Sequence, residues 1–286
     1  MLTKEQFHTK LASGVRFLDG ATGSNLQKAG MPSGCCTEDW VINHPEALVA
    51  LQRAYAAAGS QILYAPTFQA QPVGLARVGL ERQTEAVNEA LVALSRSAAP
   101  DCLIAGDITT LAAFMETWDP DNYDDMVANY RRQIRGLIDG GADLLIGETL
   151  LYAMEAEAIL EAADLENAGA VMFSFTMQPD GTLFSGRDAG SALKKLEEAG
   201  AAALGFNCVA AGPDLPALVS KLRRSVKGPL ICKPNAGLPV PGPDGTSTYP
   251  MTPAEFADIM AQCARNGATL LGGCCGTAPE FIAALL

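Results

Sequence analysis

Short apolar runs alternate with longer helical patterns along the whole 286-residue chain. The apolar runs are continuous, which is typical of strands buried on both faces of a parallel sheet. They occur at 15–20, 61–68, 102–108, 143–149, 170–177, 202–208, 229–235 and 269–275. Helical patterns lie between and after them at 45–59, 81–98, 123–141, 153–169, 189–199, 213–226, 252–267 and 278–286. Eight strand–helix units without a break in composition predict one α/β domain over residues 1–286, a single (β/α)8 TIM barrel.

An open doubly wound sheet is the competing interpretation of the same alternation. The G-x-G-x-x-G pattern of a dinucleotide site does not follow the first apolar run, and its absence favours the barrel. The chain is 49% hydrophobic, which is enough to bury the large core that a barrel requires.

The net charge, the N-terminal segment and the length of the apolar runs limit the partners and the location of the protein. The formal net charge is −12, which argues against a nucleic-acid partner, because such a partner needs clustered Lys and Arg. The polar start, residues 1–14, lacks the apolar core of a signal peptide. No apolar run reaches the roughly 18 residues of a membrane span. We therefore expect a cytoplasmic protein, with no membrane partner, whose eight cysteines are thiols.

Polar residues end the predicted strands, where barrel enzymes carry their functional side chains. These residues are Asp19, Thr67, Asp107, Glu148, Cys208, Asn235, Cys274 and Cys275. Three thiolates with one open position form a catalytic zinc site. Adjacent side chains of a regular strand point to opposite faces, but the glycines around the Cys274–Cys275 pair allow the backbone to bend there. On spacing alone, a metal site and inert core thiols are equally supported.

The other cysteines fit a structural interpretation better. Cys102 and Cys232 lie inside apolar runs, and Cys263 lies in a helical pattern. Cys35 and Cys36 follow the first run, so they could line the site, but a second metal site there is the weaker interpretation. The chain has only two histidines, neither at a strand end, which argues against histidine-based catalysis.

Several motifs resemble those of the homocysteine S-methyltransferase family. GFNC (205–208), KPNAGLP (233–239) and GGCCGT (272–277) are similar to its zinc-binding signatures. LDGATGS (18–24) and GET (147–149) resemble its N-terminal and mid-chain motifs. The resemblance covers essentially the whole chain and is closest to the homocysteine-binding barrel of the cobalamin-dependent methionine synthases.

The resemblance implies roles for particular residues. Cys208, Cys274 and Cys275 would be catalytic zinc thiolates, and the side-chain oxygen of Asn235 would fill the fourth position until substrate displaces it. Asp19 and Glu148 would hold the amino group of homocysteine. The backbone of Ala21, Thr22, Gly23 and Ser24 would bind its carboxylate, and Thr67 and Phe68 match a pair at the pocket. Turn or hydroxyl bonding remains an alternative role for Asp19, Asn235 and Thr67.

The expected reaction is methyl transfer to homocysteine, giving methionine. A free thiol with a pKa of about 8.5 is mostly protonated at neutral pH, and zinc makes it a thiolate nucleophile. The chain is too short for the folate, cobalamin and activation modules of methionine synthase. We therefore expect a separate donor, preferably methylcobalamin or a corrinoid protein, with S-methylmethionine or another small donor as the alternative. The family often has Asn where this chain has Ala65–Pro66, and the Cys35–Cys36 pair is not part of the family motifs. Because of these two departures, an acceptor thiol other than homocysteine remains an alternative.

Three other interpretations remain open at this stage. The chain could be the methyltransferase component of a corrinoid-dependent demethylation system, acting on a different donor or thiol. It could also be a non-catalytic zinc-binding barrel that docks a corrinoid protein. A metal-free lyase or aldolase is the weakest of the three, because few predicted strands end near a lysine and Lys233 is the nearest candidate.

Overall fold

A closed ring of parallel strands forms the centre of the protein. The computed structural model describes residues 1–14, 16–241 and 247–286, so Val15 of the first predicted run lies outside the described residues. Seven strands pair in parallel in chain order. They are β1 (Ile62–Tyr64), β2 (Leu103–Thr109), β3 (Leu144–Leu150), β4 (Val171–Phe175), β5 (Ala203–Ala210), β6 (Leu230–Asn235) and β9 (Leu270–Leu271).

The ring closes through the first apolar run. Phe17 pairs in parallel with Leu271 of β9, and Leu18 pairs in parallel with Ile62 of β1. This segment therefore takes the eighth position, and the predicted TIM-barrel fold is confirmed. The strands are buried along almost their whole length, which explains why their sequences do not alternate between apolar and polar residues.

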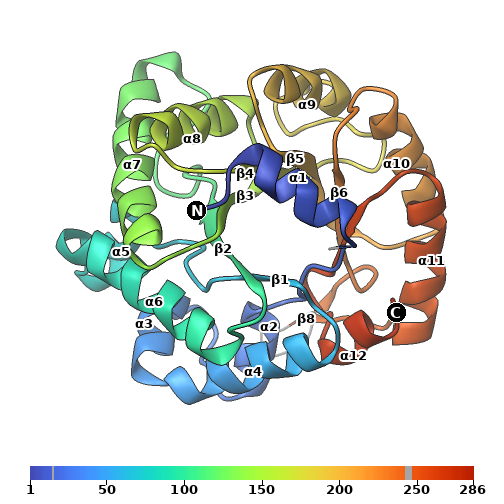
Figure 1. Cartoon of the computed structure of the whole chain (residues 1–286), viewed down its shortest axis with the longest axis horizontal. Helices are drawn as coiled ribbons and strands as arrows, with labels where there is room; N and C mark the ends of the chain where they lie inside the picture. Colours follow the sequence, from blue (N-terminus) through green and yellow to red (C-terminus); the bar gives the residue numbers. More distant parts are fainter. Residues whose placement is uncertain (15, 242–246) are drawn as a thin grey trace.

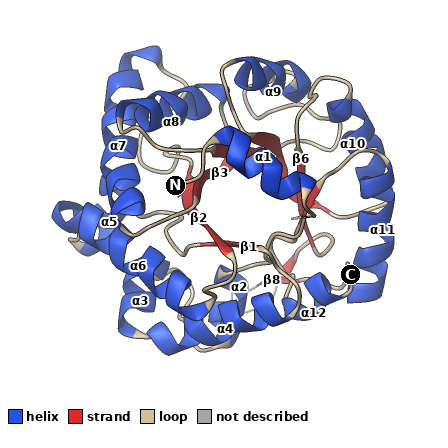
Figure 2. Ribbon diagram, in the orientation of Figure 1, coloured by secondary structure: helices blue, strands red, loops and turns tan. Residues whose placement is uncertain are grey.

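Helices surround the ring in the predicted order, and Figure 2 shows them as its outer layer. They are α4 (Pro45–Ala57), α6 (Thr84–Ala98), α7 (Tyr123–Asp139), α8 (Ala153–Leu165), α9 (Ala189–Glu198), α10 (Leu215–Arg223), α11 (Pro253–Arg265) and α12 (Pro279–Ala283). Helix α11 shows the local signals clearly: Thr252 and Glu255 form a capping box around Pro253 at the first helical position. In the part of the chain that the structure describes, no helix is long and apolar enough to cross a membrane.

The N-terminal helix α1 (Lys4–Ala12) closes one end of the barrel. It lies across the opening of the ring in Figure 1. Phe7 is fully buried among the residues that fill the barrel interior, including Leu18 and Ile146. The ring of His8 contacts the backbone oxygen of Ala202 at 2.8 Å. Since this end is plugged, a functional cavity must open at the other end, where the strands have their C-termini.

The loops at that other end carry short elements that the sequence pattern did not predict. They are α2 (Gly23–Lys28), α3 (Thr37–Asn43), α5 (Pro72–Leu75), the 3-10 turns η1 (Ala76–Val78), η2 (Glu81–Gln83) and η3 (Pro120–Asn122), and the hairpin of β7 (Val240–Pro241) with β8 (Ser247–Thr248). Helices α2 and α3 both lie after the bridged segment Phe17–Leu18 and before α4. They bring the segments around Thr22 and Glu38 to the mouth of the barrel.

Strand β9 is much shorter than the predicted run 269–275. Gly272 donates to the backbone oxygen of Cys232 on β6 at 3.1 Å, whereas Gly273 donates to that of Asp19, on the opposite side, at 3.0 Å. Cys274 then bonds back to Pro234 at 2.7 Å. The chain thus leaves the regular ladder at the glycines, and this bend sets the direction of both thiols.

Candidate active site

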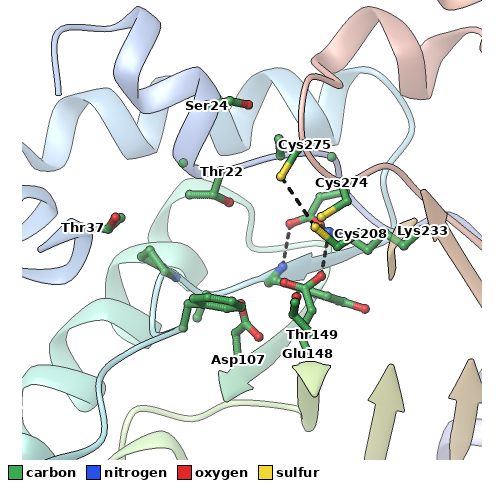
Figure 3. A pocket seen from close by; sticks show the side chains of 18 of the residues that line it. Thr22, Ser24, Thr37, Asp107, Glu148, Thr149, Cys208, Lys233, Cys274 and Cys275 are labelled. Atoms are coloured by element: carbon green, nitrogen blue, oxygen red, sulfur yellow. Dashed lines mark hydrogen bonds and ion pairs between the residues drawn. The ribbon is translucent and has the colours of Figure 1, made fainter. Parts of the chain in front are cut away.

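A cavity of about 360 Å³ opens at the C-terminal mouth of the barrel. Figure 3 shows side chains from the ends of several strands and from the first loop converging on it. It contains most of the predicted site residues, namely Asp19, Ala21, Thr22, Gly23, Ser24, Phe68, Glu148, Cys208, Cys274 and Cys275. Ala65, Pro66, Asp107 and Lys233 also line it. Thr67 and Asn235 are buried beside the cavity, outside its lining.

Three thiols converge at one side of this cavity. The sulfur atoms of Cys208, Cys274 and Cys275 all lie within 4.8 Å of one another, and those of Cys208 and Cys275 are 4.0 Å apart. Cys208 has a left-handed backbone, with φ of 57°, which is costly for a residue with a side chain. The fold therefore holds Cys208 in a strained conformation that directs its thiol to the cysteine pair that follows β9.

Asn207 organises this cluster from behind and was missed by the sequence analysis. Its Oδ1 accepts hydrogen bonds from the Thr149 backbone N–H and the Ser174 hydroxyl, both at 3.0 Å. Its Nδ2 donates to the Thr149 hydroxyl at 2.6 Å and lies 3.8 Å from Cys274 Sγ. Thr149 is also left-handed, with φ of 58°. The only signal in the sequence was the Asn that precedes Cys208 in GFNC.

The side chain of Asn235 provides a fourth polar atom near the thiols. Its Nδ2 donates to the backbone oxygen of Cys208 at 3.2 Å. Its Oδ1 is buried and has no hydrogen-bond partner among the described residues. Buried amide oxygens are normally paired, so an unpaired one on a side chain bonded to the Cys208 backbone is compatible with a metal ligand. Three thiolates that leave a fourth position open are a ligand set of catalytic zinc sites.

The neighbouring thiols shift the pKa values of Cys208 and Cys275 in opposite directions. Contacts with Cys274 and Cys275 raise the pKa of the Cys208 thiol far above its usual range. The hydrogen bonds that Cys275 receives from Cys208 and Cys274 lower its pKa. A lowered pKa favours the thiolate, which is the form that binds a metal.

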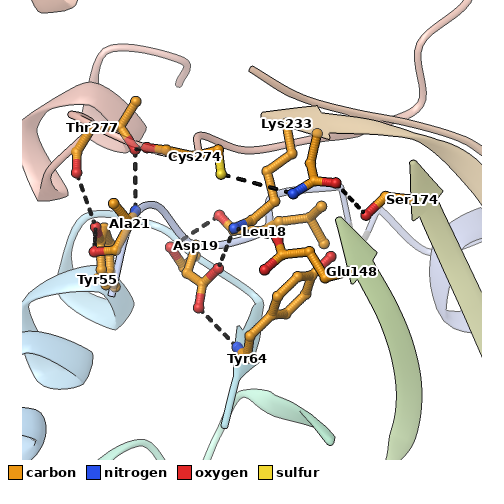
Figure 4. Close-up of polar contacts among 12 residues, drawn as sticks. Leu18, Asp19, Ala21, Tyr55, Tyr64, Glu148, Ser174, Lys233, Cys274 and Thr277 are labelled. Carbon is orange, nitrogen blue, oxygen red and sulfur yellow. Dashed lines mark hydrogen bonds and ion pairs between the residues drawn. The ribbon is translucent and has the colours of Figure 1, made fainter. Parts of the chain in front are cut away.

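Lys233 joins the two acidic residues expected to bind substrate (Figure 4). Its Nζ lies 3.1 Å from Glu148 Oε1 and 3.4 Å from Asp19 Oδ1, and 4.6 Å from the centre of the Tyr64 ring. All of these groups are buried. Although burial alone would lower it, the carboxylates of Glu148 and Asp19 raise the pKa of Lys233. The amine therefore stays protonated, which argues against the lyase interpretation because a Schiff-base lysine must be neutral.

Burial also changes the acids. It raises the pKa of Asp19 to about 6, despite the attraction of Lys233 and a 2.8 Å hydrogen bond from the Tyr64 N–H. Burial likewise raises the pKa of Glu148, against the effect of Lys233. Asp107, at the end of β2, is 5% exposed, and burial with the nearby Glu148 charge raises its pKa well above the usual range.

Two of the residues predicted to bind substrate have other contacts in the structure. The Thr67 hydroxyl donates to the backbone oxygen of Asp107 at 2.8 Å and accepts from its N–H at 3.0 Å. The Ala21 N–H donates to the Thr277 hydroxyl at 3.2 Å. Thr67 thus braces a strand end, and the Ala21 amide is occupied. At the start of α2, residues Thr22–Ser24 line the cavity, and the buried Ser24 hydroxyl is unpaired among the described residues.

The remaining cysteines lie outside the thiol cluster. Cys36 donates from Sγ to Glu38 Oε2 at 3.3 Å, and the buried Glu38 also accepts from the Gln69 N–H at 2.6 Å. Cys35 packs against a hydrophobic cluster under α3 and α4. Within the described residues, Cys208, Cys274 and Cys275 form the one grouping of potential metal ligands.

The fold and the site together define a class of protein: a (β/α)8-barrel enzyme with a three-thiol centre at the mouth of the barrel. The family model of the homocysteine S-methyltransferases matches residues 16–286. The chain belongs to this family of methyltransferases.

Individual relatives agree with the family assignment. The homocysteine S-methyltransferase of Escherichia coli is 30% identical over 296 residues, covering 95% of this chain and 94% of that protein. The metallated crystal form of the E. coli homocysteine methyltransferase MmuM has a TM-score of 0.82 at 29% identity, covering 96% of this chain and 97% of that one. The methionine synthase of Mycobacterium leprae is 28% identical over 95% of this chain. The present chain spans only 24% of the length of that methionine synthase.

Proposed function

We propose that this protein is a zinc-dependent homocysteine S-methyltransferase, built as one barrel domain over residues 1–286, that forms methionine. The observation that carries the proposal is the convergence of three sulfurs within 4.8 Å. The buried, unpaired Oδ1 of Asn235, whose Nδ2 bonds to the Cys208 backbone, supports it. The similarity to the E. coli homocysteine methyltransferase, for which a metallated form is described, supports both the acceptor and the metal.

The thiolates of Cys208, Cys274 and Cys275 would hold the zinc, with Asn235 in the fourth position. Bound zinc would lower the pKa of an incoming thiol and present it as a nucleophile at neutral pH. The strained backbone at Cys208 and the hydrogen bonds of Asn207 fix the ligands before substrate arrives. Such second-layer contacts orient metal ligands and raise their affinity for the ion.

The rest of the cavity would orient the amino acid end of homocysteine. Its ammonium would lie against the buried acids, and its carboxylate would face the backbone at Thr22–Ser24. Phe68 would form an apolar wall beside the methylene groups of the substrate. Fixing both ends of the substrate aligns the sulfur with the methyl group, and this alignment lowers the barrier to displacement.

For the methyl donor we propose a methyl-corrinoid, presented by a separate protein or as free methylcobalamin. The resemblance of GGCCGT and PNAGLP to the cobalamin branch of the family supports this donor. Large apolar side chains are also exposed on the loops that follow β2, β4 and β6, on the same face as the cavity: Trp118 (59%), Phe184 (54%) and Leu238 (72%). A small donor such as S-methylmethionine is the second candidate, because the chain matches the E. coli enzyme over 94% of that protein's length.

An assay with matched variants tests this function. Zinc-loaded protein is incubated with homocysteine and either methylcobalamin or S-methylmethionine, and methionine is measured by mass spectrometry. We expect methionine formation that is lost, together with bound zinc, in Cys208→Ala. The matched control Cys35→Ala removes a half-buried loop thiol outside the cluster and should keep both. Methionine formation that survives Cys208→Ala would contradict the proposal.

A further inference from the structure

Four buried carboxylic acids line the cavity: Asp19, Glu38, Asp107 and Glu148. Three of them have partners within the protein. Glu38 accepts from the Gln69 N–H, at 2.6 Å, and from the Cys36 thiol. Asp19 and Glu148 share the ammonium of Lys233. Partners of this kind offset the cost of burying a carboxylate.

Lys233 occupies the space between the two acids that the family resemblance assigns to the substrate amine. Its Nζ is 3.1 Å from Glu148 and 3.4 Å from Asp19. The second oxygen of Asp19 is also engaged, by the Tyr64 N–H. An ammonium from the substrate would therefore compete with a buried ammonium of the chain itself at Asp19.

Asp107 is the fourth acid and differs from the other three. Its Oδ1 is buried without a hydrogen-bond partner, as are Asp19 Oδ1 and Glu148 Oε1, but those two oxygens lie within ion-pair distance of Lys233. Among the described residues, no Lys or Arg lies within ion-pair distance of Asp107. It stands on β2, next to β3, where Asp107 pairs with Ile146 and Thr109 pairs with Glu148. Residues two positions apart project to the same face of a sheet, so Asp107 and Glu148 both face the cavity.

The backbone of Asp107 is also held firmly. The Thr67 hydroxyl bonds both to its N–H and to its oxygen, and Gln133 Nε2 donates to the same oxygen at 3.1 Å. A rigidly placed, buried carboxyl group that lacks a cation is suited to bind a cation from outside. Its raised pKa, caused by burial and by the charge of Glu148, agrees with this missing positive charge.

We infer that Asp107, beside Glu148, is the residue that binds the α-ammonium group of the acceptor thiol. This inference rests on the proposed function and deepens it: the enzyme selects amino thiols through Asp107, whereas Asp19 serves to position Lys233. The position of Asp107 in the cavity lining, its lack of a cation partner among the described residues and the occupation of Asp19 by Lys233 carry the inference.

Calorimetric binding to the zinc-loaded protein tests it, with two thiols that differ only in the amino group. Homocysteine has the group, and 4-sulfanylbutanoate lacks it. We expect the wild type to prefer homocysteine. Asp107→Asn keeps the size of the side chain and removes its charge. This variant should weaken the binding of homocysteine about ten- to hundred-fold, the usual effect of losing one charge-assisted hydrogen bond. Binding of 4-sulfanylbutanoate should stay nearly unchanged.

Asp19→Asn is the comparison variant. It should alter the binding of both thiols by a similar factor and so preserve the preference for homocysteine. Equal weakening of both thiols by Asp107→Asn, or loss of the preference in Asp19→Asn alone, would overturn the inference. A wild type that does not distinguish the two thiols would also overturn it. Failure of the proposed function would give a different result. Neither thiol would then bind through its sulfur, and removing zinc would not change the affinity for either thiol.

Discussion

The Lys233 ammonium lies 3.1 Å from the Glu148 carboxylate inside the barrel, and 3.4 Å from that of Asp19. Both acids come from other strand ends, so this one lysine links three parts of the ring around the cavity. Figure 4 shows Lys233, Asp19 and Glu148 gathered in one group. The electrostatics of the site therefore depend on a positive charge that the chain itself supplies.

Replacing this lysine should destabilise the protein strongly. Lys233→Met would leave two buried carboxylates without their cation, and breaking a buried pair from one side typically costs about 3–5 kcal/mol. Chemical denaturation measures the change. Lys221→Met is the matched control, because Lys221 pairs with Asp188 at 3.0 Å on the surface, where such pairs contribute about 0–1 kcal/mol. Equal losses in the two variants would contradict the role of Lys233.

Asn207→Ala should weaken metal binding although Asn207 is not a predicted ligand. The change removes the acceptor of Thr149 and Ser174 and the support of Cys274. Loss of such second-layer contacts typically lowers metal affinity about 10–100-fold. Competition with a zinc chelator measures the affinity, and the exposed Asn43→Ala serves as control. Unchanged zinc affinity in Asn207→Ala would show that the ligands do not need this support.

The hydroxyl of Thr67 should act through Asp107. Thr67→Val keeps the shape but removes both hydrogen bonds to the Asp107 backbone, and we expect a loss of about 1–3 kcal/mol in stability together with weaker homocysteine binding. Thr67→Ser retains the hydroxyl and should restore most of both properties. If Thr67→Val weakens homocysteine binding without any loss of stability, direct contact with the substrate would be the better explanation.

Burial of Asp19 should make stability depend on pH. Its pKa is raised from 3.8 to about 6 in the folded protein, chiefly by burial and against the attraction of Lys233. The folded state therefore holds the proton more tightly than the unfolded state, so this contribution to stability is complete below pH 3.8 and is lost as the pH rises through about 6. Denaturation from pH 4 to 7 should show the wild type losing stability relative to Asp19→Asn. Parallel profiles would contradict the raised pKa.

The barrel was predictable because its physical basis is local. Continuous apolar runs and capped helices of suitable length recur along the chain, and each run became a strand or a bridged segment. The predicted limits were too long at 61–68, where β1 ends at Tyr64, and at 269–275, where the ladder ends after Leu271. Of the run 15–20, Phe17 and Leu18 form bridges. Glycines permit this departure, but only contacts with Asp19 and Pro234, far away in the sequence, decide where the chain goes.

The site was predictable in its thiols and less so in its polar residues. The GGCCGT motif identified Cys274 and Cys275, and the structure brings them to Cys208. Nothing in the local pattern indicates that Lys233 pairs with Asp19, because the two are joined only by closure of the ring. Asn207 was missed for the same reason: its partners lie on β3 and β4. Long-range polar contacts of this kind leave no periodic signal.

The most direct test of the central claim is zinc content, followed by X-ray absorption at the zinc edge, on protein purified under reducing conditions. We predict one zinc per chain with three sulfur ligands and one oxygen ligand, changing to four sulfurs when homocysteine is added. Replacement of the oxygen by the substrate sulfur would establish both the metal and the acceptor. Protein that binds no zinc, or zinc whose three sulfurs never become four with homocysteine, would contradict the account.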